Sequence, residues 1–205
     1  MHNIVESLPS WWYHSAQVFK QEQEKIFAKQ WIFVAGASDL KNRGDYVTTE
    51  IAGRSIIVIV NDNNELGAFY NLCRHRASPL CPKTQGNIPM FICPYHSWSY
   101  GLDGSLKGAP GFVLNAEDGT GLNTGDYGLI KIRVSSWNNL VFACLDENGP
   151  SLEDWLGDIS VIAERFPSLE GMVFERLLEN EGAMNWKTYS DNSAEGYHCL
   201  RCIEN

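Results

Sequence analysis

Short apolar runs, separated by glycine, aspartate and asparagine, fill the middle of the chain from about residue 44 to 148. Runs of this length, rich in β-branched and aromatic residues, predict strands joined by turns. The expected strands are 46–51, 55–60, 66–71, 129–134 and 140–145. Every residue of Ile56-Ile57-Val58-Ile59-Val60 is apolar, which predicts a central strand buried on both faces. Leu102-Asp103-Gly104-Ser105 predicts a tight hairpin turn, and 109–128 a long surface loop.

Helical patterns flank this β-rich middle. One helix is expected near 15–29, with Ser15 as its N-cap and with Val18, Phe19, Ile26 and Phe27 on or near one face. On the other side, Ser151 can cap a helix that starts at 152. The remaining expected elements are strands at 31–34 and 172–180 and a helix at 184–202. Together these patterns predict an α+β fold whose largest part is an antiparallel β domain.

The strongest chemical signal is a pair of mixed ligand arms. Cys73-Arg74-His75 is followed, after seventeen residues, by Cys93-Pro94-Tyr95-His96, so each arm offers one thiolate and one imidazole. Such a set can hold zinc, or a 2Fe–2S cluster with cysteines on one iron and histidines on the other. Zinc sites usually pair like ligands within one arm, so the mixed arms favour iron and sulfur. A third interpretation is buried cysteines and histidines without a metal.

Composition narrows the classes of partner. The 205 residues carry a formal net charge of −9, which argues against nucleic acid and anionic membranes as partners. No apolar run approaches the about 18 residues of a membrane span, and the first ten residues show no secretory pattern. Six cysteines at irregular spacings favour metal ligation over disulfides, and we expect a cytoplasmic protein.

The residues around the two arms identify a family. Tyr70 to Ala77 together with Cys93 to Gly104 closely resemble the Rieske domain of ring-hydroxylating and related Rieske non-heme iron oxygenases, in the N-terminal portion of the α subunit. The resemblance implies that a 2Fe–2S cluster is bound by Cys73, His75, Cys93 and His96. Ala77 and Ser97 stand where the family more often has glycine, a departure that we expect to leave ligation intact.

Two imidazoles in place of two thiolates raise the potential of such a cluster from about −400 mV to between about −150 and +300 mV. The cluster would then accept electrons from a reductase or a ferredoxin and hold them for a milder acceptor. Cys81 has no partner cysteine in the second arm, so no disulfide is predicted there. Cys144, Cys199 and Cys202 are expected to be reduced thiols.

A second motif lies near the end of the chain. Asp191 to His198 resembles the family's mononuclear-iron motif, in which two histidines and one carboxylate bind Fe(II). His198 matches the first ligand, and Glu195 matches the acid that bridges His96 to this ligand. A glutamate there is similar to the branch that oxidises quaternary ammonium compounds. The second histidine is expected at position 203, which is Ile203, so this sequence by itself is predicted not to turn over substrate.

The resemblance implies three parts: an N-terminal helical segment at 1–39, a Rieske domain at 40–150 and the start of the mononuclear-iron catalytic domain at 151–205. It also implies a homotrimeric parent enzyme with mononuclear Fe(II), which uses O₂ to hydroxylate or demethylate a small aromatic or quaternary-ammonium substrate. The alternative is a stand-alone, ferredoxin-like Rieske electron carrier. Residues 40–148 would suffice for that role, and the motif-bearing segment 151–200 argues against it. A zinc-bound interaction module is a third hypothesis.

Overall fold

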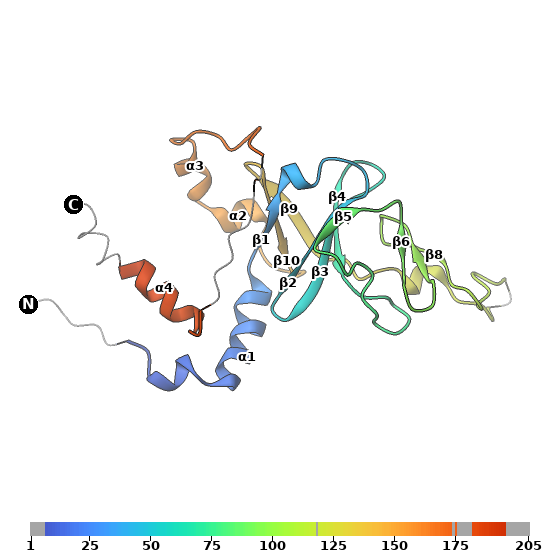
Figure 1. Cartoon of the computed structure of the whole chain (residues 1–205), viewed down its shortest axis with the longest axis horizontal. Helices are drawn as coiled ribbons and strands as arrows, with labels where there is room; N and C mark the ends of the chain where they lie inside the picture. The colour runs from blue at the N-terminus through green and yellow to red at the C-terminus, as the bar shows by residue number, and fades with distance from the viewer. Residues whose placement is uncertain (1–6, 118, 174, 176–181, 196–205) are drawn as a thin grey trace, which may run out of the picture. The chain divides into compact units, whose positions relative to one another are not determined.

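The computed structural model describes residues 7–117, 119–173, 175 and 182–195. The chain divides into two compact units. One comprises residues 24–175, and the other combines residues 1–23 with 176–205. Helices and antiparallel sheets together confirm the α+β class (Figure 1). Among the described residues, no helix is long and apolar enough to cross a bilayer.

A four-stranded antiparallel sheet forms the centre of the larger unit, in the order β4-β3-β2-β5. Its strands are β2 (Asp45–Ile51), β3 (Arg54–Val60), β4 (Leu66–Tyr70) and β5 (Gln85–Asn87). The prediction of a fully buried central strand is confirmed, because Ile56 to Ile59 have no exposed surface and Val60 is 3% exposed. The side chains of β3 are therefore buried on both faces of the sheet.

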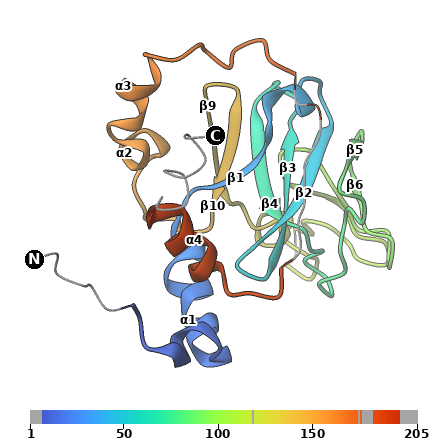
Figure 2. The ribbon, with the colours of Figure 1, turned by 60° about the vertical axis from the view of Figure 1, so that its left-hand side comes forward.

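A three-stranded sheet lies beside it, in the order β1-β10-β9 (Figure 2). It is built from β1 (Ile32–Gly36), β9 (Arg133–Trp137) and β10 (Leu140–Cys144). Val47, Ile56 and Val58 from the first sheet share one buried core with Val141 and Ala143 from the second. Burial of this apolar surface between two sheets is the main stabilising contribution in this part of the unit.

The strand predicted at 129–134 is displaced in the structure, where the strand of this hairpin begins at Arg133. Residues 129–132 instead contact the edge of the four-stranded sheet. The Tyr70 N–H donates to the Ile130 carbonyl at 3.1 Å, and the Ile132 N–H donates to the Ala68 carbonyl at 2.8 Å. Residues 129–132 thus form backbone hydrogen bonds with the edge of β4 that β3 leaves unpaired. The local sequence pattern could not reveal this pairing.

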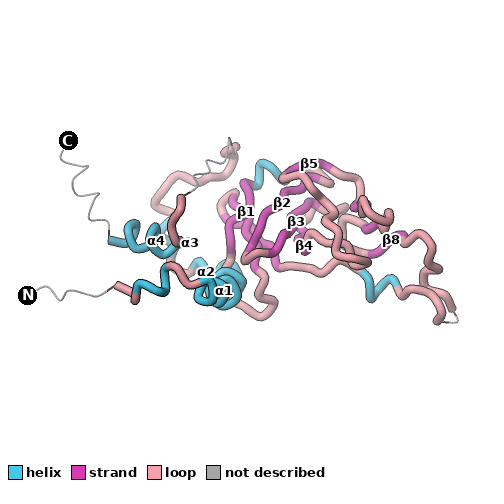
Figure 3. The backbone as a smooth tube through the Cα atoms, turned by 60° about the horizontal axis from the view of Figure 1, so that its bottom comes forward, coloured by secondary structure: helices cyan, strands magenta, loops and turns pink. Residues whose placement is uncertain are grey.

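A small third sheet carries the second ligand arm. It consists of β6 (Phe91–Ile92), β7 (Ser99–Tyr100) and β8 (Leu106–Gly108), and the part of the unit around β8 is mostly loop (Figure 3). The predicted turn at 102–105 is confirmed: it joins β7 to β8, and Gly104 has φ +83°. A Cβ at Gly104 would also collide with the Phe69 ring, so two independent constraints require glycine there.

Two short helices follow the sheets, α2 (Leu152–Leu156) and α3 (Ile159–Ala163). The predicted cap is confirmed, because the Asp154 N–H donates to the Ser151 hydroxyl at 3.0 Å. The strand predicted at 172–180 is wrong for Met172, Val173 and Glu175, which are not in a strand. The other residues of that segment lie outside the described part of the chain.

The smaller unit contains a 3₁₀ turn at Ser10–Tyr13, most of α1 (Ala16–Lys25) and α4 (Trp186–Glu195). Helix α1 ends at Lys25, earlier than predicted, and a separate 3₁₀ turn covers Phe27–Lys29. The expected apolar face is only partly buried, because Val18 is 8% exposed while Phe19 is 43% exposed. The part of the predicted helix beyond residue 195 lies outside the described residues.

Candidate metal centre

The two ligand arms adopt the same backbone conformation. Cys73 follows β4 and Cys93 follows β6. In the first arm the Cys73 N–H donates to the Ser78 carbonyl at 2.8 Å, and in the second the Cys93 N–H donates to the Trp98 carbonyl at 2.8 Å. Ala77 and Ser97 occupy matching positions, with φ values of +55° and +58°. Each arm is therefore a tight loop that is closed in the same way, although His75 lies two residues after its cysteine and His96 lies three residues after its own.

The positive φ values give a structural reason for the family's preference for glycine. A side chain in the left-handed region costs roughly 1–2 kcal/mol relative to glycine, before the greater flexibility of unfolded glycine is counted. We expect Ser97→Gly to raise the free energy of unfolding by about 0.5–1.5 kcal/mol, and Ala77→Gly to do the same. Urea denaturation monitored by circular dichroism measures this change.

Ser136→Gly is the matched control for Ser97→Gly. Ser136 is exposed in β9, opposite Val141, and its φ is not positive. The same replacement there should lower stability by about 0.5–1 kcal/mol, because glycine is unfavourable in a strand. Equal effects at both positions would show that backbone conformation is not what distinguishes Ser97.

In space, the arms sort their ligands into like pairs. The His75 and His96 rings lie 4.7 Å apart between centroids. The Cys73 and Cys93 thiols lie close enough to shift each other's pKa, and the two residues are 1% and 2% exposed. A Rieske cluster needs this division, with two sulfurs on one iron and two ring nitrogens on the other. In the described part of the chain, no three His, Cys, Asp or Glu side chains surround a single ion position.

Hydrogen-bond donors point at both sulfurs. Burial raises the pKa of Cys73, and hydrogen bonds from the Tyr100 hydroxyl and the His75 backbone N–H act against this effect. Burial also acts to raise the pKa of Cys93, but backbone N–H groups of His96 and Tyr95 bring it below its ordinary value. Donors of this kind stabilise thiolates, the form that binds metal. The residues therefore fit an iron–sulfur cluster.

His75 is also in the form that binds metal. Burial, followed by the nearby positive charges of His96 and Arg76, lowers the pKa of His75. The imidazole of His75 is consequently neutral at pH 7, with a nitrogen lone pair available to a metal. His75 is half-buried, whereas His96 is exposed and contacts the Tyr95 ring at 3.8 Å between centroids.

Tyr100 is a residue of the site to which the sequence pattern gave no role. Its hydroxyl lies 3.2 Å from the Cys73 sulfur and accepts a hydrogen bond from the Arg74 N–H at 3.0 Å. Because Arg74 N–H occupies an acceptor position, the hydroxyl proton of Tyr100 is free to point at sulfur. The sequence signal that could have indicated its burial is the two-residue spacing of Trp98 and Tyr100, which places both side chains on the buried face of an extended segment.

The predicted second metal site is not tested by the structure. Glu195 is the last residue of α4, and His198 lies outside the described residues. Cys73, Cys81, Cys93 and Cys144 are free thiols. Burial raises the pKa of Cys81 to about 11 despite a hydrogen bond with Tyr46, so this thiol is protonated at pH 7. Cys199 and Cys202 also lie outside the described residues.

The fold and the paired ligands define a Rieske-type iron–sulfur domain. In agreement, residues 30–116 match the family model of the Rieske [2Fe-2S] domain. The chain is 34% identical over 194 residues to the carnitine monooxygenase oxygenase subunit of Escherichia coli (strain K12), covering 94% of this chain and 51% of that relative. It is 32% identical to the glycine betaine monooxygenase oxygenase subunit of Pseudomonas aeruginosa (strain UCBPP-PA14), covering 94% and 44%.

Solved structures give the same result. The apo form of a quaternary ammonium Rieske monooxygenase, CntA, superimposes with a TM-score of 0.84 at 33% identity, covering 94% of this chain and 55% of that one. Naphthalene 1,2-dioxygenase with bound indole gives a TM-score of 0.66 at 34% identity, covering 74% and 34%. The chain thus contains a Rieske [2Fe-2S] domain and is similar over 94% of its length to oxygenase subunits of Rieske monooxygenases, and it spans about half the length of the curated relatives it matches.

Proposed function

We propose that Cys73, His75, Cys93 and His96 hold a 2Fe–2S cluster and that this chain supplies the electron-transfer part of a non-heme iron oxygenase. The observation that carries the proposal is the sorting of two mixed arms into a buried cysteine pair and a histidine pair. When bound, the cluster supplies a one-electron relay at a potential between about −150 and +300 mV. Exposure of His96 gives an electron acceptor access to one ligand ring.

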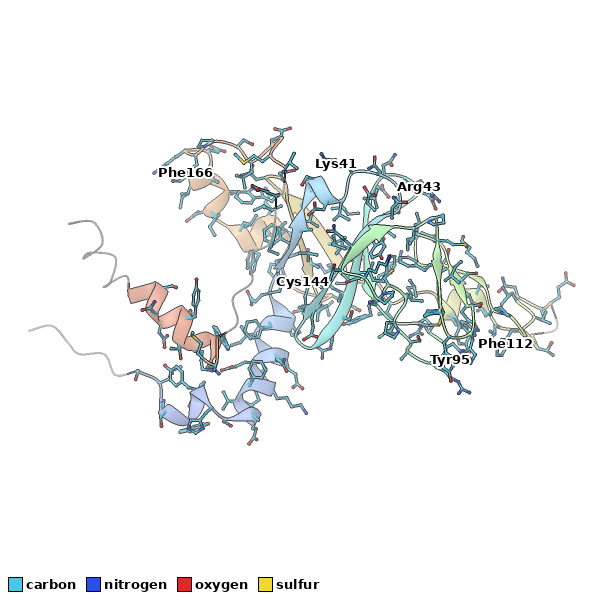
Figure 4. The ribbon with its side chains drawn as sticks, in the orientation of Figure 1. Lys41, Arg43, Tyr95, Phe112, Cys144 and Phe166 are labelled. Atoms are coloured by element: carbon cyan, nitrogen blue, oxygen red, sulfur yellow. The ribbon has the colours of Figure 1, made fainter. Side chains whose placement is uncertain are left out.

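Surface chemistry near His96 suits a protein partner. Tyr95 is 61% exposed and Phe112 is 49% exposed, and Figure 4 shows both at the end of the unit that carries β6 and β8. We propose that electrons reach the cluster from a reductase or a ferredoxin. In the parent enzyme they would pass to mononuclear Fe(II), with His198 as one ligand and Glu195 as the bridging carboxylate, in a homotrimer.

For the substrate, we propose a small aromatic or quaternary-ammonium compound that is hydroxylated or demethylated with O₂. Support comes from Glu195 and from relatives named as carnitine and glycine betaine monooxygenase subunits. These relatives match 94% of the chain, well beyond the Rieske domain at 30–116, which favours an oxygenase subunit over a stand-alone electron carrier. By itself this chain is proposed to bind the cluster without turning over substrate.

Metal and sulfide analysis of anaerobically purified protein tests the cluster. We expect about two iron atoms and about two acid-labile sulfides per chain, and a reduced-state electron paramagnetic resonance (EPR) signal typical of mixed cysteine and histidine ligation. Zinc without sulfide would overturn the proposal in favour of a zinc module. Turnover of carnitine or glycine betaine, measured with a reductase, should require a longer chain that includes the missing iron ligands.

Tyr100→Phe should lower the midpoint potential of the cluster. The hydroxyl proton near Cys73 stabilises the reduced cluster more than the oxidised one, because reduction adds negative charge. Only the difference in strength of this hydrogen bond between the reduced and the oxidised cluster changes the potential, and a difference of about 1–2 kcal/mol corresponds to a decrease of about 40–90 mV on its loss. A redox titration followed by visible circular dichroism measures the change.

Tyr95→Phe is the matched control. It also removes one hydroxyl beside the cluster loops, but Tyr95 is 61% exposed and its ring contacts His96 rather than a sulfur. Its midpoint potential should stay within about 15 mV of the parent, since an exposed hydroxyl exchanges freely with water. A shift of equal size in the two variants would mean that the short Tyr100–Cys73 contact does not tune the cluster.

A further inference from the structure

Trp98 connects the two ligand arms. Its backbone carbonyl accepts the Cys93 N–H and so closes the second arm. Its indole ring contacts the first arm, where it stacks on the His75 imidazole at 4.9 Å between centroids with only 6° between the ring planes. The indole is 2% exposed, so this stacked face of His75 is shielded from solvent.

The loop at 109–128, which supplies no candidate ligand, holds the indole from its other sides. Phe112 and Tyr127 meet the Trp98 ring edge-on, at 5.7 Å and 5.8 Å between centroids. Phe112 also meets His75 edge-on at 6.3 Å. Arg74 ties this loop to the first arm, since its guanidinium donates to the Asp126 carbonyl at 3.3 Å. The loop at 109–128 therefore encloses the candidate site together with the two ligand arms.

Ring contacts, rather than a polar anchor, hold the indole in place. Its Nε1–H is buried and has no hydrogen-bond partner within the described residues. A buried tryptophan N–H usually has a partner, and leaving it unpaired is unfavourable. The indole of Trp98 therefore contacts its neighbours through its ring and not through its N–H group.

The two imidazoles are consequently held in different ways. His75 is half-buried between Trp98 and Phe112, while His96 is exposed and contacts Tyr95, itself 61% exposed. We propose that Trp98 is a positioning residue that fixes the ring plane of His75, supported by Phe112 and Tyr127. This inference rests on the proposed ligation of iron by His75. Groups that orient a ligand imidazole tune the bound metal without touching it.

The test compares Trp98→Leu with Trp98→Phe in the purified, cluster-loaded chain. Leucine removes the flat face, so the His75 ring can sample several planes. We expect broadened EPR lines with shifted g-values, a changed nitrogen hyperfine coupling from one of the two histidines, and about two- to tenfold faster loss of the cluster to an iron chelator. Phenylalanine keeps an aromatic face and removes the unpaired N–H, so its spectrum should stay close to that of the parent.

Trp31→Leu is the control for a purely structural effect. Trp31 is 4% exposed and packs in a separate core with Phe142 and Leu152, away from the ligand arms. Its replacement should lower stability without altering the EPR spectrum. If Trp98→Leu does not hold a cluster, Phe112→Leu and Tyr127→Leu provide the decisive measurement, because both should show the same spectral change to a smaller degree.

The failure of this inference can be distinguished from failure of the proposed function. A parent protein with iron, sulfide and mixed-ligand EPR signal, but with unchanged g-values and hyperfine coupling in Trp98→Leu, would overturn the positioning role and leave the cluster assignment intact. Unchanged spectra in Phe112→Leu and Tyr127→Leu would overturn it in the same way when Trp98→Leu holds no cluster. A parent protein without sulfide would instead contradict the proposed function.

Discussion

Replacement of both His75 and His96 by cysteine should lower the midpoint potential of the cluster by at least about 250 mV, the gap between Rieske centres and four-cysteine clusters. Two thiolates in place of two neutral imidazoles add about two negative charges, which makes the added electron harder to accept. The two rings lie 4.7 Å apart between centroids, so both replacements change the same side of the proposed cluster. A dye-mediated redox titration, with EPR of the reduced state, measures the shift.

His14→Cys controls for the introduction of a thiol. His14 is exposed, lies in the smaller unit and is remote in sequence from both arms. This variant should keep the parent potential and spectrum. If the double variant at His75 and His96 also kept them, neither imidazole would be an iron ligand, and the assignment of the whole site would be wrong.

Lys187→Met should have the largest effect on stability. The Lys187 ammonium lies 2.6 Å from the Glu22 carboxylate, and the two residues are 6% and 5% exposed. The Trp186 indole N–H donates to the other carboxylate oxygen at 2.9 Å. Removing the ammonium leaves a buried carboxylate with too little compensation, which typically costs about 3–5 kcal/mol. Hydrogen exchange of the amides in α1 and α4 measures this loss of local stability.

Two comparisons isolate burial as the cause. Arg43 and Asp62 form an ion pair with the same 2.6 Å separation, but their side chains are 49% and 57% exposed. Arg43→Met should therefore cost less than about 1 kcal/mol. Replacing both Glu22 and Lys187 by methionine should recover most of the stability lost in Lys187→Met. Equal losses for Lys187→Met and Arg43→Met would contradict this explanation.

The ion pair also predicts a dependence on pH. Burial acts to raise the pKa of Glu22, but the hydrogen bonds from Lys187 and Trp186 more than compensate, so the pKa lies below its ordinary value. The stabilisation is therefore complete above the unfolded-state pKa of about 4.3 and is lost as the pH falls through the lower folded-state value. Protection of α1 and α4 should accordingly be constant near neutrality and decrease in acid below about pH 4.

Local patterns were sufficient for much of the fold. The uninterrupted run at 56–60 predicted a strand that is buried on both faces, because only such a strand tolerates apolar residues at every position. Ser151 predicted its helix start, since an N-cap bond joins residues three apart. The spacing of the two arms likewise indicated a cluster, because ligand type and separation within a tight loop are local properties.

Other features depend on residues that meet only in the folded chain. From the sequence, a glutamate such as Glu22 on a helix is expected to be exposed to solvent. In the structure it is buried, because it pairs with Lys187, which is 165 residues away in the chain. The strand expected from 129 was displaced because its first residues bond to the edge of β4. Each arm offers one cysteine and one histidine, and only the packing of β6 and β7 against the rest of the core brings like ligands together. Stacking of Trp98 on His75 likewise crosses from one arm to the other. Spacing along a chain records which groups are available, whereas long-range packing determines which of them face each other.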